Sequence, residues 1–128
     1  MQDKRITKLN GLRNDALPPT FINVANAETL LICWGSTIGA VSEAAEILRQ
    51  HGQKVGVCHF SQVWPLKPDT FLPQFETSKR VVMVESNCTG KLAMLIRQET
   101  GFNVHAKVLR YDGLAITANF IINSLKEA

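Results

Sequence analysis

Apolar segments alternate with helical segments four times, and this alternation constrains the fold more than any other feature of the chain. The apolar segments cover residues 29–34, 54–60, 80–85 and 104–112, and the helical segments cover residues 38–52, 68–75, 90–101 and 117–128. A repeated strand–helix order is typical of a parallel sheet with helices on both faces. We therefore predict a three-layer, doubly wound α/β domain with four to five mostly parallel strands, the four segments lying in the order 2-1-3-4.

The composition of the segments indicates their place in the sheet. "TLLICW" (29–34) is a continuous apolar run, which is typical of a central strand covered on both faces. "VHAKVLRYD" (104–112) alternates apolar and polar residues, which favours an edge strand. The first helix places Ile38, Val41, Ala45 and Leu48 on one face, and Gly52 is a suitable stop.

Residues 1–26 follow neither a helical nor a strand period, and they contain Gly11, Pro18 and Pro19. This composition is typical of an extended connecting segment. We therefore predict an interdomain arm over residues 1–26 and a single domain over residues 27–128.

Charge and cysteine content exclude several classes of protein. The net charge is +3, and the basic residues are scattered rather than interleaved with aromatic residues, which argues against nucleic-acid binding. No apolar stretch is long enough to span a membrane. The three cysteines, Cys33, Cys58 and Cys88, lie far apart, so they do not match a zinc or iron–sulfur motif. Reduced thiols are consistent with a cytoplasmic protein.

Two turns at the carboxyl ends of predicted strands form the candidate binding crevice. In open α/β sheets, ligands bind beyond the carboxyl ends of the strands, where the strand order reverses. "GSTIG" (35–39) and "ESNCTG" (85–90) lead into helices whose free N–H groups attract anions. Neither turn matches a dinucleotide or P-loop motif, so their glycines have an alternative, purely steric role between strand and helix. The candidate anion-binding residues are Gly35, Ser36, Thr37, Gly39, Glu85, Asn87 and Gly90.

No set of residues capable of catalysis is evident. Glu85 ends a buried strand without a second acid or a histidine near it in the sequence, and His51, His59 and His105 lie on separate segments. The rigid "VWPLKP" element (63–68) presents Trp64 and Pro65, which we interpret as a contact surface for another subunit. From the residues alone, the chain is an α/β domain with an anion-binding crevice and without catalytic or metal-binding residues of its own.

Several motifs, in order along nearly the whole chain, resemble one known domain. They are the arm "KRITKL" (4–9), "LICWGSTIGAVSEAAEIL" (31–48), "VWPLKP" (63–68), "VVMVESNCTGKLAMLIRQETG" (81–101) and "LRYDG" (109–113) followed by "IT". Together they resemble the C-terminal domain of the alpha subunit of 2-oxoacid:ferredoxin oxidoreductases. This is the transketolase C-terminal-like domain, also called core domain II.

The resemblance implies a role in the oxidative decarboxylation of a 2-oxoacid with coenzyme A to an acyl-CoA, with electrons passed to ferredoxin. It also implies that thiamine diphosphate, magnesium and the iron–sulfur clusters are held elsewhere in the complex, because the motifs that bind them are not found in this chain. The domain would then serve assembly. Its implied partners are the pyrimidine-binding domain, the beta subunit and, through the complex, ferredoxin, or a second copy of itself. Trp64, Pro65 and Asp112 are the candidate interface residues.

The chain departs from the family pattern at two places. Lys91 stands where a glutamine is expected, and Leu114–Ala115 follow Asp112–Gly113 where a proline is expected. These positions bear on the identity of the 2-oxoacid and on fine contacts. Met1 precedes an arm that in the family follows another domain, so we expect a separately expressed fragment.

Two other functions remain open. One is a free-standing flavodoxin-like carrier of a flavin or nucleotide. The other is the C-terminal domain of another thiamine-dependent enzyme, a transketolase or a 2-oxoacid dehydrogenase E1 component.

Overall fold

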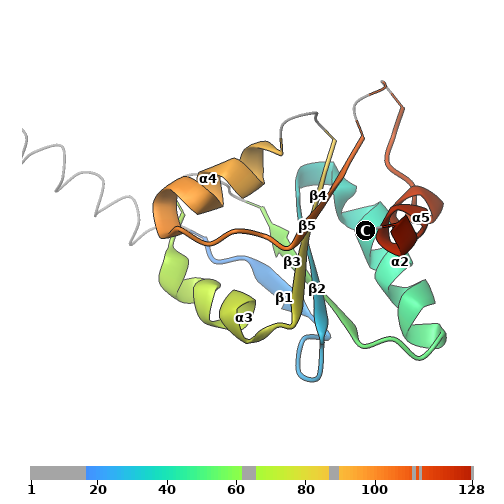
Figure 1. The fold of residues 1–128 in the computed structure, drawn as a ribbon, viewed down its shortest axis with the longest axis horizontal. Coiled ribbons are helices and arrows are strands. Elements are labelled where there is room, and N and C mark those ends of the chain that lie inside the picture. Colours follow the sequence, from blue (N-terminus) through green and yellow to red (C-terminus); the bar gives the residue numbers. More distant parts are fainter. Residues whose placement is uncertain (1–16, 62–65, 87–89, 111, 113, 128) are drawn as a thin grey trace, which may run out of the picture.

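A computed structural model of the chain describes residues 17–61, 66–86, 90–110, 112 and 114–127. Within these residues, five strands form one sheet in the order β1-β3-β2-β4-β5 (Figure 1). The strands are β1 (Thr20–Ile22), β2 (Thr29–Trp34), β3 (Val55–Phe60), β4 (Arg80–Glu85) and β5 (Ala106–Leu109). β2, β3, β4 and β5 run parallel to one another, and β1 pairs antiparallel with β3. The predicted order 2-1-3-4 of the four parallel strands is confirmed.

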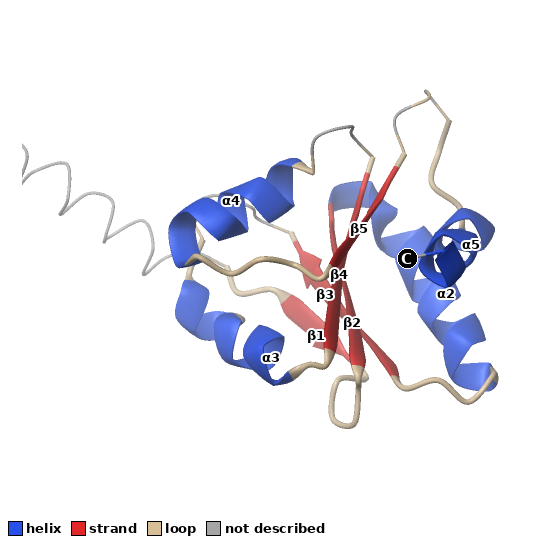
Figure 2. Cartoon of the chain, viewed as in Figure 1, coloured by secondary structure: helices blue, strands red, loops and turns tan. Residues whose placement is uncertain are grey.

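Helices cover both faces of the sheet (Figure 2). α2 (Ile38–Gln50) and α5 (Ala118–Glu127) lie on one face, and α3 (Leu72–Thr77) and α4 (Lys91–Thr100) lie on the other. Two short 3₁₀ turns, η1 (Gly35–Thr37) and η2 (Pro68–Thr70), precede α2 and α3. None of the helices in the described part of the chain has the length and apolar character that crossing a bilayer requires.

The central strands are buried on both faces, as their continuous apolar sequence predicts. Along β2, Leu30 and Ile32 pack against α3 and α4, and Leu31 and Cys33 pack against α2 and α5. All four side chains have no exposed surface. On the α3 side, the rings of Phe60, Phe71, Phe75 and Phe102 form a row with centroids 5.0–5.5 Å apart, and this row fills the space between the sheet and α3.

β1 lies inside the segment predicted to be an arm without regular structure. Its three residues pair with β3, from Thr20 opposite His59 to Ile22 opposite Val57. Three residues are too few to produce a recognisable period in the sequence. The arm is therefore joined to the sheet as an antiparallel edge strand.

Two elements differ from their sequence-based bounds by more than a residue or two at an end. The helix predicted over residues 68–75 is divided into η2 and α3, because Pro73 has no N–H for a continuous helix and instead lies in the first turn of α3. β5 is shorter than the predicted strand 104–112. Its pairing with β4 extends by one bond at each end, from His105 N to Val81 O at 2.8 Å and from Arg110 N to Glu85 O at 3.1 Å.

Three of the candidate residues, Trp64, Pro65 and Asn87, lie outside the described residues, so their roles stay predictions.

Candidate functional site

A pocket of about 320 Å³ opens at the carboxyl ends of β2 and β4, where the sequence predicts the crevice. Its lining comes from the end of β2, from η1 and from the start of α4. The lining residues are Trp34, Gly35, Ser36, Thr37, Ser86 and Lys91. Three candidates of the first turn, Gly35, Ser36 and Thr37, therefore line this pocket, next to Ser86 of the second turn.

Glu85, the last residue of β4, precedes Ser86 of the pocket lining and is fully buried. Its Oε1 accepts hydrogen bonds from Trp34 Nε1 at 3.0 Å and from the backbone N–H of Leu92 at 2.7 Å. Its Oε2 lies 3.4 Å from the backbone nitrogen of Ala93, which donates to it. The carboxylate thus joins the ends of β2 and β4 to the first turn of α4.

This arrangement places an internal anion at the amino end of α4. The N–H groups of a helix's first turn and the helix dipole attract negative charge. Glu85 supplies that charge from within the chain, so part of the anion-binding capacity predicted for the second turn is used by the protein itself. Gly90 lies next to it with φ +66°, and a Cβ there would be 3.3 Å from Glu85 Oε2 and 3.4 Å from Lys107 Cδ.

In the turn after β2, two side chains contact backbone carbonyl oxygens. Thr37 donates its hydroxyl hydrogen to Trp34 O at 2.8 Å, and a ring nitrogen of His59 lies 3.1 Å from Gly35 O. Gly35 has φ +64°, which favours glycine. Gly39 has space for a Cβ, with nothing within 4 Å, so the steric explanation offered for this glycine is wrong.

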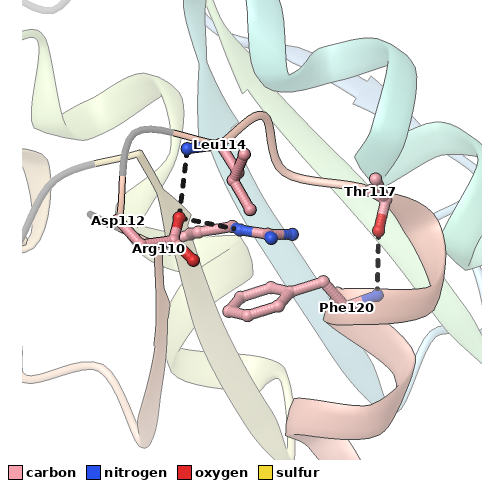
Figure 3. Close-up of polar contacts among 5 residues, drawn as sticks. All are labelled: Arg110, Asp112, Leu114, Thr117 and Phe120. Carbon is pink, nitrogen blue, oxygen red and sulfur yellow. Dashed lines mark hydrogen bonds and ion pairs between the residues drawn. The ribbon is translucent and has the colours of Figure 1, made fainter.

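A second polar cluster surrounds Asp112 in the loop between β5 and α5 (Figure 3). Asp112 Oδ1 accepts hydrogen bonds from Arg110 Nε and from the backbone N–H of Leu114, both at 3.1 Å. The Arg110 guanidinium lies 4.6 Å from the centre of the Phe120 ring. Thr117 caps α5, because its hydroxyl oxygen accepts a hydrogen bond from the N–H of Phe120 at 3.2 Å.

The described residues contain no group of three or more His, Cys, Asp or Glu side chains that could hold a metal ion. Cys33 and Cys58 are buried. Burial raises the pKa of the Cys33 thiol to about 12 and raises that of Cys58 further, so both thiols are protonated at neutral pH.

Comparison with known proteins identifies the domain. The family model described as "Transketolase, C-terminal domain" matches residues 21–119. The chain belongs to this family. A solved structure of 2-oxoglutarate:ferredoxin oxidoreductase from Magnetococcus marinus, with 2-oxoglutarate, coenzyme A and succinyl-CoA bound, is 32% identical to this transketolase C-terminal domain. The match covers 99% of this chain and 22% of that one, with a TM-score of 0.87.

Two further relatives agree. The alpha subunit of 2-oxoacid:ferredoxin oxidoreductase 1 from Aeropyrum pernix is 29% identical over 103 residues, which are 78% of this chain and 16% of the subunit. The structure of an alpha chain of a probable 2-oxoacid ferredoxin oxidoreductase from Thermoplasma acidophilum is 26% identical, with a TM-score of 0.60. That match covers 86% of this chain and 95% of that one. This transketolase C-terminal domain is thus homologous to an oxidoreductase subunit, and it spans about one-sixth to one-fifth of its longer relatives.

Three features of this transketolase C-terminal domain were not predicted from the sequence. One is the hydrogen bond between Trp34 and Glu85, and the other two are the positions of Ser86 and Lys91 in the pocket lining. Trp34 and Glu85 are 51 residues apart and lie on neighbouring parallel strands. The sequence did place both residues at the end of a predicted strand. Because the ends of parallel strands meet at one edge of the sheet, this position could have indicated that the two residues lie close together.

Gly39→Ala is expected to raise the free energy of unfolding by about 0.5–1 kcal/mol, because alanine favours a helix interior more than glycine does. The substitution adds a Cβ to α2 in open space. Urea unfolding of the variant and the parent chain checks this. A destabilised variant would contradict the open environment seen at Gly39.

The Asp112 cluster predicts a small pH-dependent contribution to stability. The Leu114 N–H and the Arg110 guanidinium hold the pKa of the Asp112 carboxyl below its usual value. Its contribution is therefore present above the pKa of the unfolded chain and is lost as the pH falls through the lower, folded pKa. The stability difference between the parent chain and Asp112→Asn should be largest near neutral pH and shrink in acid. A constant difference from neutral pH into acid would argue against this assignment.

Proposed function

We propose that this chain is the core domain II of a 2-oxoacid:ferredoxin oxidoreductase alpha subunit and that it serves assembly rather than catalysis. The complex would decarboxylate a 2-oxoacid oxidatively with coenzyme A, producing an acyl-CoA and reducing ferredoxin in the cytoplasm. The similarity to the Magnetococcus enzyme supports this proposal, because it covers 99% of the chain, the arm included. Residues 1–26 would then connect to a pyrimidine-binding domain, and residues 27–128 would form the assembly domain.

The observation that carries the non-catalytic role is the structural use of Glu85. It is the one fully buried charged side chain among the described residues. A catalytic carboxylate in a thiamine enzyme must reach the cofactor or the substrate. Glu85 instead accepts hydrogen bonds from an indole and from the backbone of α4. Its role is to hold two strands and a helix together.

Thiamine diphosphate, magnesium and the iron–sulfur clusters would be held by other parts of the complex. The donor groups of the described residues do not fit these cofactors. Magnesium prefers clustered oxygen ligands and iron–sulfur clusters prefer thiolates, whereas acidic side chains do not converge here and the two described thiols are buried and protonated. No step of the reaction is therefore assigned to this domain.

The partners in this proposal are the pyrimidine-binding domain and the beta subunit, with ferredoxin binding to the complex. Asp112 and its neighbour Leu114 lie on the exposed β5–α5 loop, and Leu114 is 62% exposed. This loop is available for a contact with another domain. The family match does not support the alternative of a flavodoxin-like carrier.

Calorimetry on the isolated chain tests the non-catalytic role. Titration with thiamine diphosphate and Mg²⁺ is expected to give only the heat of dilution, and the same should hold for a titration with FMN. A 1:1 binding isotherm for thiamine diphosphate in the micromolar range would overturn the assembly role. One for FMN would favour the carrier instead.

A further inference from the structure

The amino end of β5 is joined to β4 by an unusual pair of hydrogen bonds. β5 is an edge strand, and its register with β4 runs from Val82 opposite Ala106 to Glu85 opposite Leu109. One residue earlier, the backbone N–H of His105 donates to Val81 O at 2.8 Å. The backbone N–H of Val81 donates in return to Nδ1 of the His105 ring, also at 2.8 Å. A side chain thus takes the place of a backbone acceptor in the ladder.

The N–H of Val81 depends on this ring nitrogen. Neighbouring N–H groups along a strand point to opposite sides, and the N–H of Arg80 bonds to Glu28 O, at the β2 side of the sheet. The N–H of Val81 therefore points toward β5. Val81 is fully buried, so loss of the ring acceptor would leave a buried donor without a partner.

Nδ1 accepts a hydrogen bond only while it carries no hydrogen. The neutral ring must therefore hold its hydrogen on Nε2. A protonated imidazolium has hydrogens on both nitrogens, and two N–H groups would then face each other across the β4–β5 junction. Solvent can reach the ring, because His105 is exposed. The rings of His105 and Phe102 pack against each other in a T-shaped arrangement, with their centroids 6.3 Å apart.

No ion pair joins His105 to an acid among the described residues. Strand alternation places Lys107 on the face of the sheet that His105 shares, and Arg80 on the opposite face. The segment 101–104 carries no charged residue. The remaining charged side chains on the adjoining parts of α3 and α4 are Glu76, Arg97 and Glu99.

We propose that His105 makes the amino end of β5 an acid-sensitive part of the fold. Protonation of the ring breaks the bond from Val81 and releases the start of β5, together with the segment 102–105 that leads into it. The rest of the sheet keeps its pairing, because the bonds of β2 with β3 and β4 do not involve a titrating acceptor. This inference is independent of the proposed function.

Backbone hydrogen exchange of the full chain tests the proposal. Imidazoles titrate between about pH 8 and 5. Protection of the Val81 amide, corrected for the intrinsic rate at each pH, is expected to fall by about tenfold from pH 7.5 to pH 5, because an imidazolium cannot accept the Val81 N–H. The Leu31 and Ile32 amides in β2 serve as internal references and should change less. Equal pH dependence at Val81 and in β2 would overturn the proposal.

His105→Asn is the matched variant, because Oδ1 of asparagine is as many bonds from the backbone as Nδ1 of histidine. It can accept the same hydrogen bond and does not titrate. It should keep Val81 protected and remove the acid-dependent loss, whereas His59→Asn should leave that loss unchanged. A second measurement does not depend on any variant. The nitrogen chemical shifts of His105 at pH 7.5 should identify a ring with its hydrogen on Nε2, and a hydrogen on Nδ1 would contradict the inference.

Discussion

Glu85→Ala is expected to lower the free energy of unfolding by about 3 kcal/mol. The side chain has no exposed surface, and three donors point at its oxygens. Alanine would leave the Trp34 indole N–H and the first N–H groups of α4 without this acceptor, and it would open a cavity between β4 and α4. Urea unfolding followed by circular dichroism measures the loss.

Two further variants separate the carboxylate from general effects. Glu85→Gln keeps the volume and one acceptor oxygen but turns an NH₂ group toward α4, so about half of the loss is expected. Glu43→Ala, on the exposed side of α2, should change stability by less than about 0.5 kcal/mol. A loss below about 1 kcal/mol for Glu85→Ala would mean that water or neighbouring groups replace the carboxylate, and the structural role assigned to Glu85 would be wrong.

Gly56→Val is expected to destabilise the domain by about 2 kcal/mol and to loosen the segment that contains β1. A Cβ on Gly56 would lie 2.9 Å from Val24 Cγ1, 3.0 Å from Ala27 Cβ and 3.1 Å from Asn23 O. These contacts are too short, and one of them is backbone. The segment that follows β1 would have to move away from β3.

Urea unfolding measures the stability of Gly56→Val, and limited proteolysis reports on the segment. New cleavage is expected within residues 17–27, with the rest of the domain still protected. Gly39→Ala is the matched control, because its added Cβ meets nothing and should not increase cleavage there. Unchanged stability and cleavage in Gly56→Val would contradict the close packing of residues 23–27 on β3.

The central part of the fold follows directly from the sequence. β2 and β4 have the bounds that their apolar runs predict, and the order of the four parallel strands is as predicted. β1 was not predicted, because its three residues gain their structure by pairing with β3, more than thirty residues away. The break between η2 and α3 depends on Pro73, which interrupts the helix although the apolar spacing continues across it.

The two predicted turns lie at one edge of the sheet, but the contacts between them were not predicted. Whether the turns bind an anion stays a prediction. The turns after β2 and β4 meet at one pocket, as strand order implies. The partner of Glu85 was not predictable from local sequence, since Trp34 approaches it only once β2 and β4 are paired. Asp112 likewise organises its own loop through Arg110 and Leu114. Whether Trp64, Pro65 and Asp112 contact another subunit stays a prediction.

Co-purification with an activity assay tests the assembly role most directly. The chain, carrying an affinity tag and expressed in its own cells, is isolated under anaerobic conditions. The account expects subunits bearing a pyrimidine-binding domain and iron–sulfur clusters to co-purify with it, and the material to reduce methyl viologen when a 2-oxoacid and coenzyme A are both present. The same chain purified alone from a foreign host should show no such reduction. Activity of the chain alone, or isolation from its own cells without any thiamine-dependent activity, would contradict the account.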